Sequence, residues 1–376
     1  MAGQQDGRRV AVTGPDGFVA WHVRCAARAR WGGDLVHLGH AELVDVDRLA
    51  AALESVDAVI HLAGVNRSPD PDEVTRVNPW LAGQLVAGLE RAGRSVPVVY
   101  GNSVHSTGTS PFGVAKQQAA DILTDWGRRT GAPVADVVLP NLFGEHGRPH
   151  YNSVVATFCH ELAGGRSPQV VDDRALPLLH VQRAAALLLD LTDGTTSGRV
   201  DVEGQLLLVS EVLARLEAIA TDYVEGVLPD LADPLTRDLF YTYRAATFPE
   251  QFPLHPPVHS DARGSLVEAV KARGGQAQAF YSSTRPGFVR GNHFHLHKVE
   301  RFLVLRGEGR IDLRRLFGHE TLQFAVSGER PAIVDMPTMW VHSLVNTGSD
   351  ELVALFYADE LFDPDRPDTY PEQVQP

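Results

Sequence analysis

Cysteine is scarce in this sequence, which has only Cys25 and Cys159 among its 376 residues. Two cysteines do not provide a disulfide framework, so a reducing, cytoplasmic location is the expectation. Long apolar runs are lacking as well, because the longest, residues 184–191, is too short to cross a bilayer and predicts a helix. The polar N-terminus shows no signal-peptide pattern. We therefore expect neither secretion nor a membrane partner.

Positive charge is the other deficit. The chain has 34 lysine and arginine residues against 47 aspartate and glutamate residues, which gives a formal net charge of -13. Such a balance argues against nucleic acid as a partner, although local basic groups can still hold a small anionic ligand. With 44% hydrophobic residues and a mean hydropathy of -0.12, the chain can bury sizeable cores. Its length predicts two domains or one large one.

A glycine-containing turn follows the first predicted strand. Residues 9–13 form a short apolar strand, Gly14 and Gly17 follow it, and Phe18 lies at the start of an amphipathic helix. Glycines in this setting let the backbone approach a pyrophosphate, whose charge is attracted by the helix N-terminus. Ala20 stands where a third glycine is usual, which is a small change. The turn therefore predicts dinucleotide binding.

Strands and helices alternate through the first half of the chain. Further strands are predicted at residues 35–38, 58–64, 96–100 and 134–139, and helices at 46–53, 78–92, 114–129, 154–163 and 205–223, with another beginning near His180. This alternation predicts an α/β fold, a Rossmann-like doubly wound parallel sheet.

Several short motifs accompany the glycine turn. Leu62, Ala63 and Gly64 end the third strand, Ser103 follows the fourth, Lys116 lies in a helix, and Pro140–Gly144 reads Pro-Asn-Leu-Phe-Gly. Together with the turn they resemble the extended short-chain dehydrogenase/reductase family that acts on nucleotide sugars. The resemblance implies cofactor binding by Gly14, Gly17, Phe18, Leu62, Ala63, Gly64 and Lys116, and catalytic roles for Ser103 and Lys116. No acidic residue follows the second strand, which favours NADP(H) over NAD.

A tyrosine is missing from this resemblance. The family uses a tyrosine four residues before the lysine as its proton donor, and this sequence has Phe112 there. General acid catalysis contributes ~10²–10⁴ in rate, so hydride chemistry should be impaired. Tyr100, His105 and Thr107 are the possible replacements, and the sequence does not choose among them.

The segment after residue 140 offers groups for a substrate. Asn141, Arg148, Asn152 and Ser153 precede or open the helix predicted at 154–163. A helix N-terminus with a basic neighbour can hold a diphosphate. Asn152 or Ser153 can equally cap the helix, and the two interpretations are compatible.

A proline-rich segment marks the expected boundary between domains. Residues 248–257 hold four prolines, which predicts an extended linker between a reductase-like domain at 1–247 and a second domain at 258–376. Beyond the linker the pattern changes to short strands with frequent turns, which predicts an all-β jelly roll.

A histidine-rich motif lies in the second domain. His293, His295 and His297 alternate along a predicted strand and should face one side, and Glu300 follows. His342 could add a ligand from a facing strand. Imidazoles with a carboxylate suit a borderline divalent metal such as zinc, nickel or iron(II). The alternative is a cluster of surface histidines on an antiparallel sheet that has no role in metal binding.

The spacing of these residues resembles the paired motifs of the cupin family. It reads G-x5-H-x-H-x4-E-x6-G from Gly287 to Gly307 and then P-x4-H-x3-N from Pro337 to Asn346. The resemblance implies metal ligation by His293, His295, Glu300 and His342, with zinc as the expected ion. A metal-free site remains an alternative. Lys271, His295 and His297 are the acid–base candidates, and Arg263 and Arg290 are expected to hold the diphosphate.

The order of the two halves narrows the resemblance further. With residues 61–67, 140–144, 151–154, 291–295 and 362–370, the chain resembles bifunctional enzymes of capsule and O-antigen synthesis that lead to UDP-N-acetyl-L-talosamine. The resemblance implies a homodimer whose cupin epimerises carbon 3 of a UDP- or dTDP-linked 4-keto-6-deoxy sugar. The reductase half would then reduce carbon 4 with NADPH. Two alternatives remain: a cupin epimerase with an inactive reductase half, and a non-catalytic binding protein.

Overall fold

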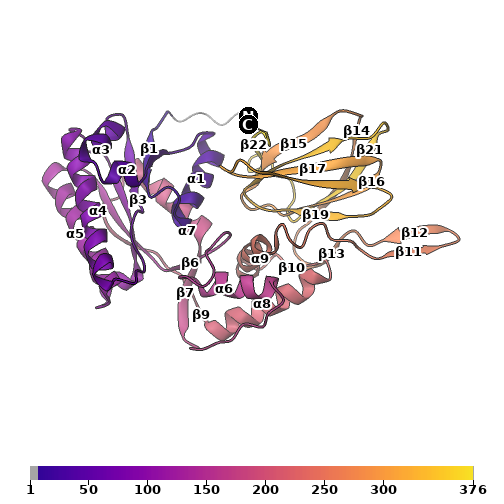
Figure 1. The fold of residues 1–376 in the computed structure, drawn as a ribbon, viewed down its shortest axis with the longest axis horizontal. Helices are drawn as coiled ribbons and strands as arrows, with labels where there is room; N and C mark the ends of the chain where they lie inside the picture. The colour runs from indigo at the N-terminus through magenta and orange to yellow at the C-terminus, as the bar shows by residue number, and fades with distance from the viewer. Residues whose placement is uncertain (1–6, 376) are drawn as a thin grey trace. The chain divides into compact units, whose positions relative to one another are not determined.

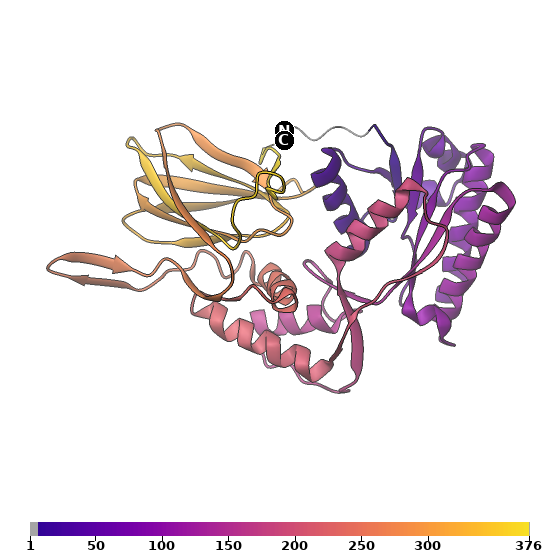
Figure 2. The same ribbon diagram turned by 180° about the vertical axis from the view of Figure 1, so that it is seen from behind.

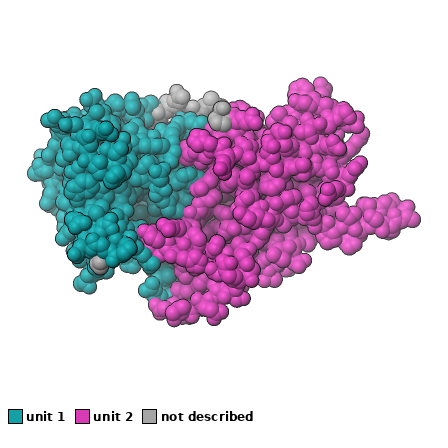
Figure 3. Space-filling model, viewed as in Figure 1, with its two compact units in different colours: residues 1–143, 174–208 teal, residues 144–173, 209–376 magenta. Residues whose placement is uncertain are grey.

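The structure is a computed structural model that describes residues 7–375. The chain divides into two compact units (Figure 3). Unit 1 comprises residues 1–143 and 174–208, and unit 2 comprises residues 144–173 and 209–376. Among the described residues, no helix is both long and apolar enough to span a membrane.

A six-stranded parallel sheet forms the centre of unit 1, with the strand order β2-β1-β3-β4-β5-β8. Its strands are β1 (Val10–Thr13), β2 (Val36–Leu38), β3 (Ala58–His61), β4 (Val98–Ser103), β5 (Val134–Leu139) and β8 (Gly198–Asp201). The central strands β1, β3 and β5 are buried along their whole length, as expected for strands covered on both faces. The predicted Rossmann-like parallel sheet is confirmed, and β8 adds an edge strand that the sequence did not indicate.

Helices cover both faces of this sheet. They are α1 (Phe18–Trp31), α2 (His40–Leu43), α3 (Val46–Leu53), α4 (Pro71–Arg91), α5 (Pro111–Thr130) and α7 (Val181–Asp190), with short 3-10 turns η1 (Val104–Thr107) and η2 (Leu191–Asp193). One core joins the sheet to α3, α4 and α5 through Leu49, Leu85 and Trp126. The other core joins it to α1 and α7 through Val23 and Leu188. The sheet is therefore doubly wound.

A second, three-stranded sheet in unit 1 has the order β6-β7-β9. It contains β6 (Asn141–Phe143), β7 (Ala175–His180) and β9 (Gln205–Leu208). The single helix predicted at 205–223 is wrong at its start, because 205–208 pairs with β7 and the helix α8 begins at Val209. A short run of leucines is compatible with a helix or a strand, and here hydrogen bonding to β7 makes it a strand.

Unit 2 contains a group of three helices, α6 (Val154–Ala163), α8 (Val209–Val224) and α9 (Pro234–Thr247). A strand pair, β10 (Val227–Asp230) and β13 (Lys271–Gly274), lies beside them. The side chain of Asp233 caps α9 by accepting from the Thr236 amide, and Pro234 suits the first turn. The helices bury Tyr223 and Phe240 against each other.

Two antiparallel sheets make up most of the remainder of unit 2. The first has the order β14 (Gln278–Thr284), β21 (Leu352–Ala358), β16 (Glu300–Arg306) and β19 (Ile333–Met336). The second has the order β18 (Thr321–Ser327), β17 (Glu308–Arg315), β20 (Trp340–Asn346), β15 (Val289–Phe294) and β22 (Tyr370–Pro371). A hairpin of β11 (Val258–Asp261) and β12 (Gly264–Val267) projects from them (Figures 1 and 2). This all-β part is consistent with a cupin-like domain.

The proline-rich segment 248–257 packs within unit 2 rather than forming a free extended linker. Phe248 is buried, and its ring contacts those of Phe252, Phe324 and Trp340. Leu254 forms a β-bridge with Ile333 in β19. Burial of Phe248 and Phe252 stabilises this packing. The proline content of the segment gives no indication of that burial. This packing does not decide where one domain ends and the next begins, so the domain limits at 247 and 258 remain a prediction.

Candidate functional site

The glycine turn lies at the carboxyl ends of β1 and β3. Gly14 has a φ of 64°, and a Cβ there would lie 3.1 Å from the Ala63 Cα. The Gly17 amide donates to the Gly14 carbonyl at 3.0 Å, and Phe18 begins α1. Only glycine fits this close, left-handed turn. Its bare backbone in front of a helix N-terminus fits the pyrophosphate of a dinucleotide.

A threonine and a histidine hold the β3 loop against β1, a pair whose role the sequence did not indicate. The Thr13 hydroxyl accepts from the Leu62 and Ala63 amides, each at 2.9 Å, so its own proton goes to His61 Nδ1 at 2.9 Å. Burial, with a smaller effect of the Lys116 charge, lowers the pKa of His61 to about 3. His61 is therefore neutral and fixes the loop that carries Leu62, Ala63 and Gly64.

Lys116 and Ser103 lie near the end of β4. The Lys116 Nζ donates to the Gly101 carbonyl at 2.6 Å and lies 4.2 Å from the centroid of the Tyr100 ring. Burial lowers the pKa of Lys116 to about 7, although the charge of Asp136 opposes the shift. The Ser103 hydroxyl accepts from the His105 amide at 3.2 Å.

Phe112 lies one turn before Lys116 in α5 and has no proton to donate. Tyr100 does not replace it, because its buried hydroxyl donates to the Lys116 carbonyl at 3.3 Å and burial raises its pKa. Thr107 is exposed, and its hydroxyl donates to a main-chain carbonyl of its own turn. The exposed His105 ring lies 6.5 Å from the Phe112 ring, measured between centroids, so it is the candidate that remains.

The predicted substrate residues fall in both units. In unit 1, the Asn141 side chain donates to the Pro177 carbonyl at 3.3 Å. In unit 2, the Arg148 guanidinium lies 4.9 Å from the Tyr151 ring, and Asn152 is exposed. Ser153 caps α6 by accepting from the Ala156 amide at 3.2 Å, which confirms the capping interpretation. Their role with a diphosphate remains a prediction.

Four residues predicted as metal ligands converge in unit 2. They are His293 in β15, His295 just beyond its end, Glu300 at the start of β16 and His342 in β20. Each offers a ligand atom within 4.8 Å of those of the others. A register shift between Gly291 and His293 interrupts the pairing of β15 with β20 at this point. Such a bulge re-aims side chains, which helps the histidines to meet.

The cluster is buried and compact. The exposed fractions of His295, His342 and Glu300 are 2%, 1% and 8%. One Glu300 oxygen, Oε2, lies 3.1 Å from His295 Nε2 and 3.6 Å from His342 Nε2. The ring of His293 lies 4.9 Å from that of His295 and 4.6 Å from that of His342, measured between centroids.

The protonation preferences of the cluster follow from this packing. Burial opposes ionisation of Glu300, but the adjacent His295 and His342 together outweigh it and hold the carboxyl pKa well below its usual range. Burial likewise lowers the pKa of His295, but the charge and hydrogen bond of Glu300, together with Asp368, outweigh it and the pKa is raised. Burial and the neighbouring imidazoles lower the pKa of His293 to about 3.

Main-chain carbonyls orient two of the imidazoles. His295 Nδ1 donates to the Asp368 carbonyl, and His342 Nδ1 donates to the Trp340 carbonyl at 3.3 Å. Both Nε2 atoms are thereby directed into the cluster, where they make no well-formed hydrogen bond within the described residues. Metal-binding histidines typically donate their second nitrogen in this way, so the donor set fits a divalent ion such as zinc.

Asp368 is a residue that sequence reasoning did not assign to the site. Its carboxylate accepts from the amides of Leu296, His297 and Lys298 at 3.0, 2.8 and 2.7 Å. The loop after β15 is therefore tied to the C-terminal segment. In the sequence, Asp368 was noticed only as part of segment 362–370, one of the segments that carry the family resemblance.

Two predicted catalytic residues are not brought to the cluster. His297 is exposed and lies outside the four-residue group, because β15 ends at Phe294 and the alternation of faces ends with it. Lys271 lies in β13, which pairs with β10 rather than with either large sheet. The expectation that all three histidines share one strand face was therefore wrong.

The two predicted phosphate-binding arginines are exposed. Arg263 lies in the turn of the β11–β12 hairpin, where it pairs with Asp261. Arg290 in β15 donates to the Ser283 carbonyl at 2.9 Å and to the Thr284 hydroxyl at 3.0 Å. The structure does not bring either one into the histidine cluster, and their role with a substrate remains a prediction.

Comparison with known protein families matches both halves of the chain. Residues 7–193 match the NAD dependent epimerase/dehydratase family, and residues 259–370 match the polysaccharide biosynthesis C-terminal domain. A UDP-2-acetamido-2,6-beta-L-arabino-hexul-4-ose reductase from Pseudomonas aeruginosa is 33% identical over 366 residues, which cover 96% of this chain and 98% of that protein.

Two solved structures extend the comparison. The capsular polysaccharide assembling protein CapF from Staphylococcus aureus has a TM-score of 0.61 and 27% identity, covering 97% of this chain and 100% of that chain. RMD from Pseudomonas aeruginosa, solved with NADPH, has a TM-score of 0.50 and 25% identity, covering 57% of this chain and 82% of that chain. Both units thus have counterparts in a solved structure, since CapF is matched over 97% of this chain.

Proposed function

Because this chain belongs to the family of the Pseudomonas aeruginosa UDP-sugar reductase, and so is a nucleotide-sugar-modifying enzyme of the epimerase/reductase type, we propose a two-step role for it. The cupin-like part of unit 2 inverts carbon 3 of a UDP-linked 4-keto-6-deoxy sugar. Unit 1 binds NADPH and reduces carbon 4. A dTDP-linked sugar is the alternative substrate, and a homodimer is the proposed assembly.

The convergence of His293, His295, Glu300 and His342 carries the proposal. A carbon–hydrogen bond beside a ketone is acidic, and epimerisation removes that proton on one face and returns one on the other. A divalent ion held by these four residues, zinc in our proposal, would supply positive charge near the carbonyl oxygen. Of the three acid–base candidates, only His295 lies in the cluster, and in a metal-free site it would hold and move the proton.

The reduction depends on unit 1. Bound at the Gly14 turn, NADPH would supply the hydride for carbon 4, and the carbonyl oxygen needs a proton to become an alcohol. Lys116 and Ser103 can orient the substrate and the cofactor, but Phe112 supplies no proton. His105, whose ring lies 6.5 Å from that of Phe112, is the proposed donor of a slower reduction.

The proposal is tested with a UDP-4-keto-6-deoxy sugar in deuterated water, with and without NADPH. Mass spectrometry should show deuterium at carbon 3 without NADPH, and His342→Gln should lower its rate by about 10²-fold or more. An exposed histidine outside the cluster provides the control, so His259→Gln should exchange like the wild type. Absence of exchange, or exchange that survives His342→Gln, would contradict the proposal.

A second candidate is favoured by Phe112 alone. In this case the protein is an epimerase whose reductase unit binds cofactor or substrate without chemistry. Exchange at carbon 3 together with no oxidation of NADPH would identify it.

A further inference from the structure

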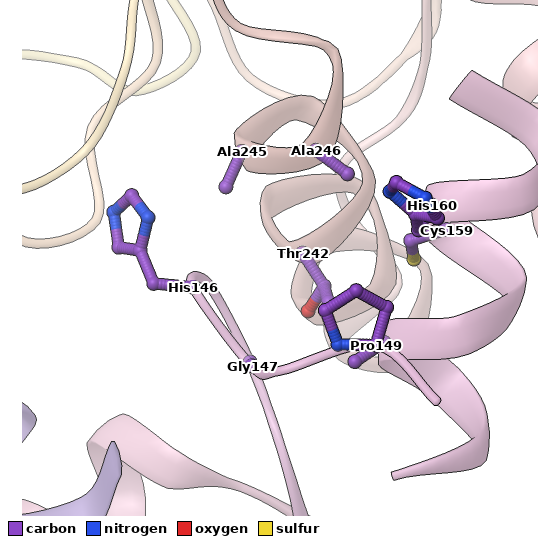
Figure 4. A pocket seen from close by; sticks show the side chains of 10 residues that line it. His146, Gly147, Pro149, Cys159, His160, Thr242, Ala245 and Ala246 are labelled. Atoms are coloured by element: carbon purple, nitrogen blue, oxygen red, sulfur yellow. The ribbon is translucent and has the colours of Figure 1, made fainter. Parts of the chain in front are cut away.

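A cavity of about 120 Å³ lies in unit 2 between a loop and two helices (Figure 4). Its walls come from the loop at 144–149, from α6 and from α9, and His160 of α6 is one of the lining residues. Neither proposed catalytic step uses this cavity, and His160 connects it to a second group of ionisable side chains.

That group consists of His150, His160 and Glu161. Each offers a ligand atom within 4.8 Å of those of the other two. His150 Nε2 lies 3.0 Å from Glu161 Oε1, and the two imidazole rings are perpendicular with centroids 5.6 Å apart. Two imidazoles and one carboxylate are a common ligand set for zinc, with a fourth position left to water.

The backbone holds this group in place. His150 has a φ of 55°, and its amide donates to the Thr157 hydroxyl at 3.0 Å. Thr157, His160 and Glu161 are spaced three and four residues apart, so they lie on one face of α6. The loop histidine is therefore fixed over the helix face that carries its two partners.

One contact competes with a metal. The Arg166 guanidinium hydrogen-bonds to Glu161 Oε2, while Oε1 faces His150. A surface salt bridge would explain the Arg166 contact alone. It does not explain why the His150 ring, from a separate segment, packs against the His160 ring while its Nε2 lies 3.0 Å from the carboxylate, with all three ligand atoms within 4.8 Å of one another. We expect Arg166 to keep the affinity for a metal ion modest, because the metal must share the Glu161 carboxylate with the Arg166 guanidinium.

We propose that His150, His160 and Glu161 bind a divalent transition-metal ion, with zinc as the probe, beside the cavity between α6 and α9. This site has no ligand in common with the cluster of His293, His295, Glu300 and His342. It leaves one coordination position for water or for a small ligand in the cavity.

The test is a zinc titration of the full-length protein against a chromophoric chelator. His150→Asn and His160→Asn should each bind one equivalent fewer than the wild type, whatever the occupancy of the other cluster. Arg166→Gln should raise the affinity of the same site for zinc severalfold, because Glu161 then no longer pairs with a guanidinium. His259→Asn, an exposed histidine outside both groups, should match the wild type.

Equal zinc uptake by His150→Asn and the wild type overturns the proposal. So does an equivalent that is lost in His259→Asn as readily as in His150→Asn, because binding would then be that of any surface histidine. His150 is more than half exposed, with a side-chain exposure of 57%, so its variant is expected to fold. Circular dichroism checks that expectation.

Discussion

In unit 1 the buried Lys116 amine lies against a main-chain carbonyl and the Tyr100 ring, whereas in unit 2 two imidazoles contact one buried carboxylate and a third packs against both of them. The first arrangement positions a charge, and Phe112 stands where a proton donor would be expected. The second brings several exchangeable groups together. The comparison supports the proposal that unit 2 carries its own proton-handling groups, while reduction in unit 1 would require a cofactor and a proton donor other than Phe112.

The largest expected effect removes the shared carboxylate. Glu300→Gln keeps the size of the side chain but removes the charge that faces His295 and His342. Deuterium exchange at carbon 3 should fall by about 10²–10³-fold, measured by mass spectrometry. Glu320→Gln, an exposed matched change, should exchange at the wild-type rate. If Glu300→Gln leaves the rate of exchange unchanged, the Glu300 carboxylate does not take part in proton transfer, and the proposed difference between the two units is wrong.

The next effect restores the donor that unit 1 lacks. Phe112→Tyr places a hydroxyl one turn before Lys116, so the rate of NADPH oxidation, followed by absorbance, should rise about 10²-fold. Phe112→Leu adds no proton donor and should give no increase. If Phe112→Tyr gives none either, the missing tyrosine does not limit reduction in unit 1.

A smaller effect concerns the residual reduction. If His105 donates the proton in the wild type, His105→Ala should lower NADPH oxidation by about tenfold, while exchange at carbon 3 stays unchanged. His37→Ala is the control, since this partly exposed histidine lies on β2 and pairs with Asp34. Equal rates for His105→Ala and the wild type would assign the proton to water.

The last expected effect is on stability rather than on a rate. The pKa of Lys116 is about 7 in the native state against an ordinary value of 10.5. Between these values the unfolded chain binds a proton that the native chain lacks, so the free energy of unfolding should rise with pH by up to about 1.4 kcal/mol per unit. Below pH 7 both states are protonated, and native burial of the charge destabilises the fold.

Denaturant unfolding of the cofactor-free protein at several pH values checks this. Lys116→Met should remove the rise and should gain most relative to the wild type at the acidic end. Lys271→Met changes a half-buried lysine of unit 2 and should keep the rise. A rise that persists in Lys116→Met would mean that Lys116 is not the group responsible.

Prediction from the sequence succeeded where a local pattern is coupled to burial. Strands β1, β3 and β5 are apolar throughout because both faces are covered, and this pattern is visible without a structure. It failed at β7, β8 and β9, which are short and partly exposed and so carry little periodicity. Their formation depends on neighbours distant in the chain.

The same division holds for the candidate site. The spacing of His293, His295, Glu300 and His342 indicated the ligand set. His293 and His342 pair directly across β15 and β20, where cross-strand neighbours meet at predictable positions, whereas Glu300 comes from β16 of the other sheet. The spacing did not show that His297 leaves the group, because the end of β15 and the Asp368 contacts set that turn.

The sequence by itself determined the parallel sheet of unit 1, the glycine turn, the absence of a tyrosine at position 112 and the set of clustered histidines, because each depends on residue type and short spacing. Only the tertiary structure decided which imidazoles meet Glu300, that Tyr100 is committed to a main-chain carbonyl, and that His150 reaches α6. Those outcomes depend on contacts between segments far apart in the chain, whose free energies no local pattern records.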